Sequence, residues 1–251
     1  MDHAALILGV TACFLLAGAV KGVIGIGLPV VAMGLLGLTM PTVQAAALLV
    51  VPSFVTNVWQ MVAGPSLLPI VRRLFTMQLC MFLGTFAGIG FLTGSSAALA
   101  SAMLGAVLVA YAVVGLLAVR FAVRRSFEPW LSPIVGLLTG LLTGATGVFV
   151  VPAVPYLASL RLEKEELIQA FGFSFTMSTV ALGVGLAASG AFAAFWVGSS
   201  IFALVAALVG MLVGQRIRSR LQPEVFRRWF FVGLLLIGLY MLIRTLRVAW
   251  A

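Results

Sequence analysis

Two glycine-rich stretches, VKGVIGIGLPVV at 20–31 and LTGATGVFVVPAV at 142–154, interrupt long apolar runs of this sequence. Glycine and proline both weaken a helix, because glycine costs backbone entropy and proline lacks an amide donor. Each stretch therefore predicts a broken helix, one in each half of the chain. The paired positions are Gly22 with Gly144, Gly25 with Gly147 and, after a slip of one residue, Pro29 with Pro152.

The composition predicts that lipid surrounds most of the chain. Of its 251 residues, 63% are hydrophobic and 8% are charged, and the mean hydropathy is +1.24. A soluble domain carries about 25% charged residues, since its surface must face water. The formal net charge of +9 is interpreted as basic residues in cytoplasmic loops, not as a nucleic-acid-binding surface. The first apolar run, 4–20, has no basic residue ahead of it, so it predicts a retained span and not a signal peptide.

Two counts of membrane crossings agree with the apolar runs. The segments 4–40 and 131–160 are each either one span with a loop or two short spans meeting at a break. These alternatives lead to eight or ten crossings, since about 20 apolar residues span a bilayer. The remaining spans are expected at 42–63, 74–93, 98–119, 166–188, 192–214 and 229–246.

The distribution of lysine and arginine favours ten crossings. With eight crossings the basic loops divide evenly between the two sides and Lys21 is left within a span. With ten, all of them except Arg244 and Arg247 fall on one side, thirteen against two. Basic residues accumulate on the cytoplasmic side of membrane proteins. We therefore expect a multi-pass protein of the plasma membrane, the inner membrane of a bacterium, with both termini outside.

The two halves, 1–125 and 126–251, are expected to be inverted repeats. TVQAA at 42–46 corresponds to LIQAF at 167–171, and the GxxxG motif starting at Gly84 corresponds to the one starting at Gly210. Five crossings in each half reverse the second repeat relative to the first. The expected fold is an all-α polytopic membrane protein with broken or short helices at the Gly-Pro motifs. Paired broken helices are typical of secondary transporters, which hold their solute near the midplane.

At these residues the chain resembles the sulfite exporter TauE/SafE family of membrane transporters. The resemblance rests on the doubled elements GVIGIGLP and GATGVFVVP, the Gln-Ala pair after each, and the ending GQRIRSRL…FRRWFFVGLLLIGLYML at 214–242. Val148 and Phe149 stand where further glycines are common in the family. The resemblance implies export of sulfite, organosulfonates or related small organic anions. An uptake permease for such anions, or a carrier of another small solute, remains an alternative.

The broken helices supply the candidate solute site. Free N–H groups at half-helix ends attract anions, and glycine lets the backbone approach them closely. The alternative role of these glycines is close helix packing. Lys21 is either a counter-charge for an anion or a lysine that reaches toward the membrane surface. The backbone candidates are Gly22, Gly25, Gly27, Pro29, Gly144, Gly147 and Pro152.

Polar residues inside the spans complete the predicted site. Gln44 and Gln169, at matching places, are either solute ligands or bonds between helices. Asn57 and Gln60 are expected to line the path, together with Ser53 and Thr56 on the same helix. The remaining candidates are Thr143, Ser174 and Thr176, although such hydroxyls often bond their own helix.

Several classes of function are excluded or disfavoured by what the sequence lacks. The acids are Asp2, Glu128, Glu163, Glu165, Glu166 and Glu224, all expected in loops or termini. Without a carboxylate or histidine at the midplane, we expect no proton relay, no metal, no cofactor and no enzyme. A purely structural membrane protein would not need two broken-helix repeats. The expected partners are membrane lipid and a small anionic solute, not nucleic acid, and the oligomeric state stays open, a homodimer included.

Overall fold

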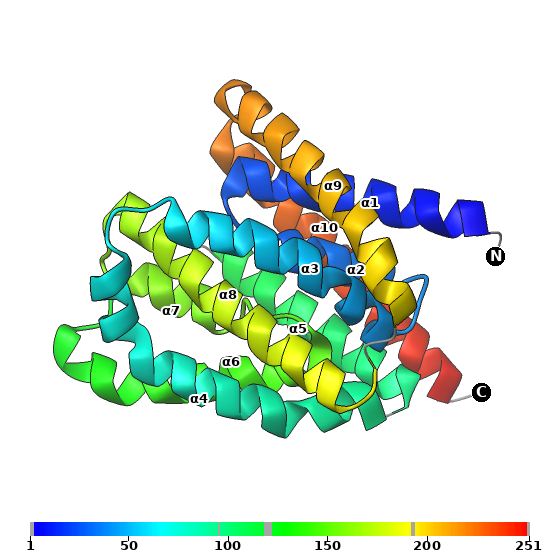
Figure 1. The fold of residues 1–251 in the computed structure, drawn as a ribbon, viewed down its shortest axis with the longest axis horizontal. Coiled ribbons are helices and arrows are strands. Elements are labelled where there is room, and N and C mark those ends of the chain that lie inside the picture. The colour runs from blue at the N-terminus through cyan, green and yellow to red at the C-terminus, as the bar shows by residue number, and fades with distance from the viewer. Residues whose placement is uncertain (1–2, 95, 118–121, 192–193, 250–251) are drawn as a thin grey trace.

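The computed structural model describes all residues except 1–2, 95, 118–121, 192–193 and 250–251, and the described residues contain helices and no strands (Figure 1). The α-helices are α1 (His3–Ile24), α2 (Leu28–Leu36), α3 (Thr42–Val62), α4 (Leu67–Gly94), α5 (Ala97–Leu117), α6 (Glu128–Thr146), α7 (Ala153–Ser159), α8 (Lys164–Ala188), α9 (Ala194–Ile217) and α10 (Pro223–Ala249). Two short 3-10 turns, Arg125–Phe127 and Arg218–Arg220, precede α6 and α10.

Glycines join α1 to α9 in a parallel pair. A Cβ added at Gly18 would overlap the backbone of Ala207, and one at Gly22 would overlap that of Met211. The contacts advance in step along both helices, so the helices run in the same direction. Small residues permit this close approach of two backbones in a membrane.

An equivalent parallel pair is formed by α4 and α6. Gly136 faces the backbone of Met77, and Gly144 faces that of Thr85. Glycines of α4, including Gly84, pack in turn against the backbone of α6. The two pairs therefore use the same device, with glycines on both partners.

The central pair, α3 and α8, is antiparallel. Gly172 near the start of α8 lies against Met61 near the end of α3, whereas Gly183 lies against Val50. The helices α5 and α10 are also antiparallel, since Gly105 meets Gly238 and Gly115 meets Phe231.

The helices α2 and α7 are short, and each lies in the chain between two longer helices. Gly27 lies beside Phe230 and Gly37 beside Met241, so α2 runs parallel to α10. With nine residues α2 is about 13 Å long, well short of a bilayer of roughly 30 Å. The second of the two short spans expected within 4–40 and within 131–160, at 23–40 and 146–160, is therefore helical over Leu28–Leu36 or Ala153–Ser159 and otherwise only at its first residues, where α1 and α6 end.

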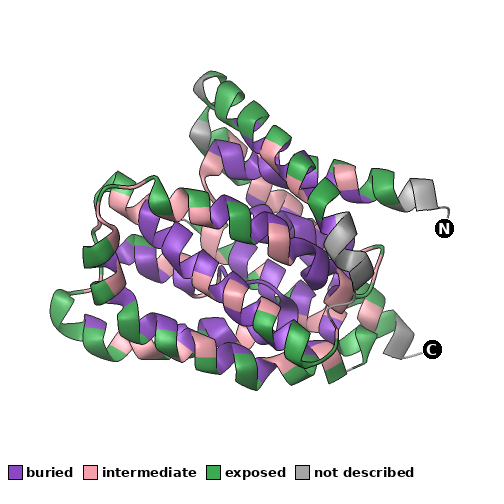
Figure 2. Cartoon of the chain, in the orientation of Figure 1, coloured by how far each residue is buried: buried purple, intermediate pink, exposed green. Residues whose placement is uncertain are grey.

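Seven described helices, α1, α3, α4, α5, α8, α9 and α10, are long and apolar enough to cross a membrane. Figure 2 shows exposed residues along their outward faces and buried residues toward the interior, and many of the exposed residues are apolar. Leu83 and Leu236 are 59% and 62% exposed, which suits contact with lipid. The protein is a multi-pass membrane protein.

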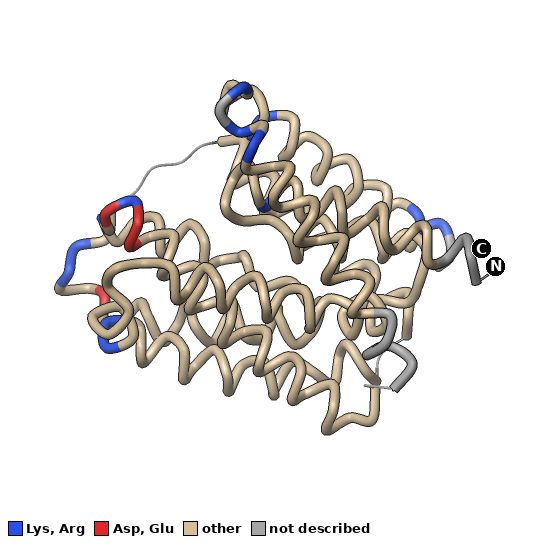
Figure 3. Tube along the Cα trace, turned by 45° about the horizontal axis from the view of Figure 1, so that its top comes forward, with Lys and Arg blue, Asp and Glu red and all other residues tan. Residues whose placement is uncertain are grey.

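The molecule has two ends of different charge. We call the end where α1, α3, α5 and α9 finish the basic end, and the opposite one, where both termini lie, the terminal end (Figure 1). Lys and Arg gather away from the termini, apart from a pair near the C-terminus (Figure 3). That pair is Arg244 and Arg247, at the end of α10. The described glutamates lie at the starts of α6, α8 and α10, which are also at the basic end.

Candidate functional site

Lys21 lies in the last turn of α1 and is only 5% exposed. Its Nζ donates to Thr56 Oγ1 at 3.1 Å and to Asn57 Oδ1, both on α3. Neither partner carries a charge, and among the described residues Lys21 forms no ion pair. An ammonium group buried with only neutral partners is costly.

Two buried polar atoms without a hydrogen-bond partner lie on α3, at and one turn before its contacts with Lys21. Because an ammonium only donates, the oxygen of Asn57 must face Lys21 and its amide nitrogen must face elsewhere. Asn57 Nδ2 is buried and has no hydrogen-bond partner, and Ser53 Oγ is in the same condition one turn earlier on α3. Buried polar atoms are nearly always satisfied in proteins. These two atoms are therefore exceptions on α3, although neither residue lines the cavity beside Lys21.

A cavity of about 170 Å³ opens beside Lys21 at the basic end. Its wall includes the first break, where Gly25 adopts a φ of +88° that favours glycine. Gln60 Nε2 donates to the carbonyls of Gly25 and Ile168, at 3.2 and 3.0 Å, and so ties the break to α8. The lining residues are Lys21, Gly22, Gly25, Thr56, Trp59, Gln60, Ala63, Gly64, Glu165, Ile168, Met211, Gln215 and Arg218.

Five of the predicted residues thus meet at one cavity, namely Lys21, Gly22, Gly25, Thr56 and Gln60. Asn57 adjoins it only through Lys21, and Ser53 is not among its lining residues. Gly22 serves helix packing as well, since an added Cβ would lie 2.9 Å from the amide nitrogen of Gln215. Gly27 (φ +108°) precedes α2, and Pro29 lies buried in its first turn, outside the cavity lining.

The second break lies elsewhere. Gly147 packs against Met33 and against Ala46 near the start of α3, whereas Gly25 is bonded to Gln60 near the end of α3. Ala46 and Gln60 are fourteen residues apart on α3, which corresponds to about 21 Å along the helix at 1.5 Å per residue. The structure does not bring the two breaks together at a common midplane. Pro152 directly precedes α7, also away from the cavity lining.

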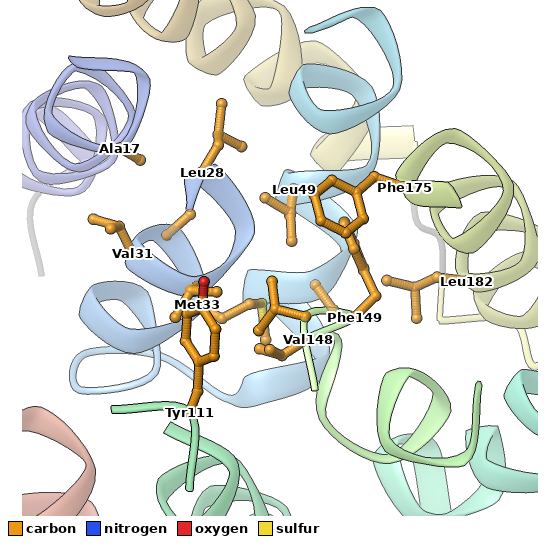
Figure 4. Close-up of a cluster of buried hydrophobic side chains, with 14 of the residues drawn as sticks. Ala17, Leu28, Val31, Met33, Leu49, Tyr111, Val148, Phe149, Phe175 and Leu182 are labelled. Carbon is orange, nitrogen blue, oxygen red and sulfur yellow. The ribbon is translucent and has the colours of Figure 1, made fainter. Parts of the chain in front are cut away.

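Apolar side chains fill the interior between these levels. Val148 and Phe149, which follow Gly147, are fully buried and lie with Met33, Leu49 and Phe175 (Figure 4). The rings of Phe149 and Phe175 have centroids 5.2 Å apart. The departure from glycine at Val148 and Phe149 therefore adds core volume beside the second break.

The two predicted glutamines behave differently. Gln169 ties α8 to the α3–α4 connection, donating to the carbonyls of Met61 and Gly64 and accepting from the amide of Ser66 at 2.7 Å. It is therefore a bond between segments. Gln44 is half-buried at the start of α3, at the terminal end, and forms no side-chain hydrogen bond with the described residues.

The predicted hydroxyls of the second half also lie outside the cavity. Thr143 and Thr176 donate to carbonyls of their own helices, those of Thr139 and Gly172. Ser174 accepts from Gln78 Nε2 at 2.8 Å between α8 and α4. Gly144 packs against α4, where an added Cβ would lie 2.7 Å from the amide nitrogen of Ile89.

Sequence reasoning missed several cavity residues, of which Gln215 and Arg218 matter most chemically. Gln215 lies in the last turn of α9 and Arg218 begins the 3-10 turn after it, and only the parallel packing of α1 on α9 carries them to Lys21. Both belong to the stretch GQRIRSRL that carried the family resemblance. The family resemblance of that stretch was the signal that could have pointed to these residues, but it indicated no role for either of them.

A comparison with protein families now bears on this geometry. The family model described as sulfite exporter TauE/SafE matches residues 10–241. The chain belongs to the TauE/SafE family. This confirms the resemblance and makes the protein a membrane transporter from a family that handles sulfur-related anions. It also agrees with a function other than catalysis. No curated protein and no solved structure matches the chain.

Proposed function

We propose that this protein exports small oxyanions of the sulfite or organosulfonate type and binds them in the cavity beside Lys21. The observation that carries the proposal is the buried ammonium of Lys21, which lines the cavity and has only the neutral partners Thr56 and Asn57 among the described residues. An oxyanion in the cavity would supply the missing negative charge and accept a hydrogen bond from Lys21. Charge-assisted hydrogen bonds are stronger than neutral ones.

The size of the cavity fits a small ion. A water molecule occupies about 30 Å³ of liquid, so a space of about 170 Å³ holds a compact oxyanion with part of its hydration shell. Glu165 and Arg218 line the same cavity with side chains that are largely exposed. We propose that Arg218 attracts anions to the entrance from the basic end.

The proposed architecture is two inverted repeats, 1–125 and 126–251. Exchanging α1 with α6, α3 with α8, α4 with α9 and α5 with α10 converts the parallel pair α1–α9 into the parallel pair α6–α4. The same exchange leaves the antiparallel pairs α3–α8 and α5–α10 unchanged. This agreement of helix direction and glycine packing supports the repeat. In this proposal, the nonhelical segments after α1 and α6 are the equivalent breaks of the two repeats.

We propose that the basic end faces the cytoplasm of a bacterial cell and both termini face outward, following the positive-inside bias. The Lys21 cavity then opens to the cytoplasm. An inside-negative potential favours outward movement of an anion by about 2.3 kcal/mol per charge per 100 mV. Export therefore needs no coupling ion, and no carboxylate lies near the middle of the described spans to carry one.

The apolar cluster around Phe149 suggests how passage is controlled. Along α3 the Lys21 contacts lie at residues 56–57, and the cluster includes Leu49, closer to the terminal end. We propose that the two repeats rock against each other about α3 and α8. This motion would repack the apolar cluster and let the solute pass.

Flux of radiolabelled sulfite from proteoliposomes tests the proposal. Lys21→Gln should reduce the initial rate at least tenfold, since a hydrogen bond to a charged group contributes about 1.5–3 kcal/mol. Lys164→Gln is the matched control, because Lys164 is exposed at the same end and outside the cavity lining. Equal rates for both variants would overturn the assignment of Lys21. Concentrative uptake driven by a proton gradient would favour the uptake permease instead.

A further inference from the structure

A second cavity, of about 320 Å³, lies at the terminal end of the molecule. It is bordered by the end of α2, the start of α3, the start of α5 and the last turns of α10. Its lining residues are Gly37, Leu38, Thr39, Met40, Pro41, Thr42, Ala97, Ala98, Ser101, Arg244 and Thr245. None of these is a carboxylate, and the sequence contains no acid between residues 3 and 127.

Arg244 places a positive charge in this cavity. Its Nη1 donates to the carbonyl of Leu38 at 3.1 Å, which holds the side chain across the connection between α2 and α3. A guanidinium has five N–H donors, so this single bond leaves others for a ligand. Arg247, one turn later on α10, does not line the cavity.

Thr42 provides an independent sign of a ligand. It is 3% exposed and lines the cavity, and among the described residues its hydroxyl forms no hydrogen bond. Thr42 also begins α3, and Ala97 begins α5. The first N–H groups of a helix have no partner within it and carry partial positive charge. Two such helix starts, a free hydroxyl and a guanidinium therefore meet around one space.

We infer that this cavity is a second binding site for the transported oxyanion, at the opposite end of the route from Lys21. The inference rests on the proposed function for the identity of the ligand. Because α3 begins at the Arg244 cavity and ends at the Lys21 cavity, one helix borders both sites. An anion leaving the Lys21 site would thus meet a second cation before it reaches the outside.

Equilibrium dialysis of labelled sulfite against purified protein, under anaerobic conditions, tests this inference by counting sites. The wild-type chain should bind two sulfite ions, Lys21→Gln one, and Arg244→Gln one. Arg247→Gln is the matched control, with the same charge change on the same helix, and should keep two. Thr42→Val, which preserves the Arg244–Leu38 bond, should weaken the second site severalfold. Unchanged melting temperatures establish that the variants are folded.

Each outcome separates the two proposals. If Arg244→Gln and Arg247→Gln both keep the wild-type count, the terminal site is overturned, whatever Lys21→Gln does. If Lys21→Gln keeps the count but Arg244→Gln lowers it, the Lys21 assignment fails and the terminal site stands. Displacement of sulfite from the Arg244 cavity by added phosphatidylglycerol, with no effect at Lys21, would assign the cavity to a lipid headgroup and overturn the inference.

Discussion

Replacing Gly144 by alanine distinguishes a glycine that packs helices from one that lines a solute site. An added Cβ would overlap the Thr85 carbonyl oxygen and lie 2.7 Å from the amide nitrogen of Ile89 on α4. Ordinary contacts begin at 3.4 Å, so α6 and α4 must separate locally by at least about 0.7 Å. A gap of this size forfeits roughly a quarter to a half of each affected van der Waals contact.

The expected magnitude follows from a matched comparison with Gly90→Ala on α4. Nothing lies within 4 Å of a Cβ placed at Gly90, so this variant changes only helix propensity, which favours alanine by about 1 kcal/mol. Gly144→Ala gains the same propensity but adds an overpacking cost of about 1–3 kcal/mol. That difference corresponds to a melting temperature roughly 2–12 °C lower than that of Gly90→Ala, at about 2–4 °C per kcal/mol.

Differential scanning fluorimetry in detergent measures the comparison, and sulfite binding is measured on the same samples. We expect Gly144→Ala to melt below Gly90→Ala, and at or below the wild-type protein, while its sulfite affinity stays within twofold. Equal melting temperatures for the two variants, together with weakened sulfite binding, would refute the packing argument and return Gly144 to the solute site.

Three further predictions follow from the contacts at the two ends. Gln169→Ala removes three hydrogen bonds at the α3–α4 connection and should destabilise the protein by about 2 kcal/mol, seen as faster hydrogen exchange at 62–66, whereas Gln44→Ala should leave exchange there unchanged. Arg73→Ala leaves the mostly buried Glu128 without its ion-pair partner at 2.6 Å, so it should lower the free energy of unfolding by about 2 kcal/mol. In a double-mutant cycle, the variant that lacks both Arg73 and Glu128 should lose less stability than the two single variants lose together. Alkaline phosphatase fused after α10 should be active, because we expect the C-terminus outside; an inactive, stably expressed fusion would contradict the orientation.

Much of the fold could be predicted because membrane insertion depends on local composition. The six uninterrupted spans correspond to α3, α4, α5, α8, α9 and α10 with shifts at their ends. The interrupted segments were harder, since glycine and proline mark a break but do not say how much helix remains beside it. Hence the first short span expected within 131–160, at 131–143, lies inside the 19-residue α6, whereas α7 covers only seven residues of the second, at 146–160.

By itself, the sequence determined the membrane class and the family, and it predicted the two breaks and the choice of Lys21, because each depends on residue type and spacing along the chain. Only the tertiary structure decided which glycines pack helices and which border a cavity, since Gly144 and Gly25 look alike until their neighbours are known. It also brought Arg218 to the Lys21 cavity and Arg244 beside Thr42, contacts between residues that are far apart in sequence. Burial of a charge and the absence of a hydrogen-bond partner are properties of such long-range packing, and the candidate sites depend on both.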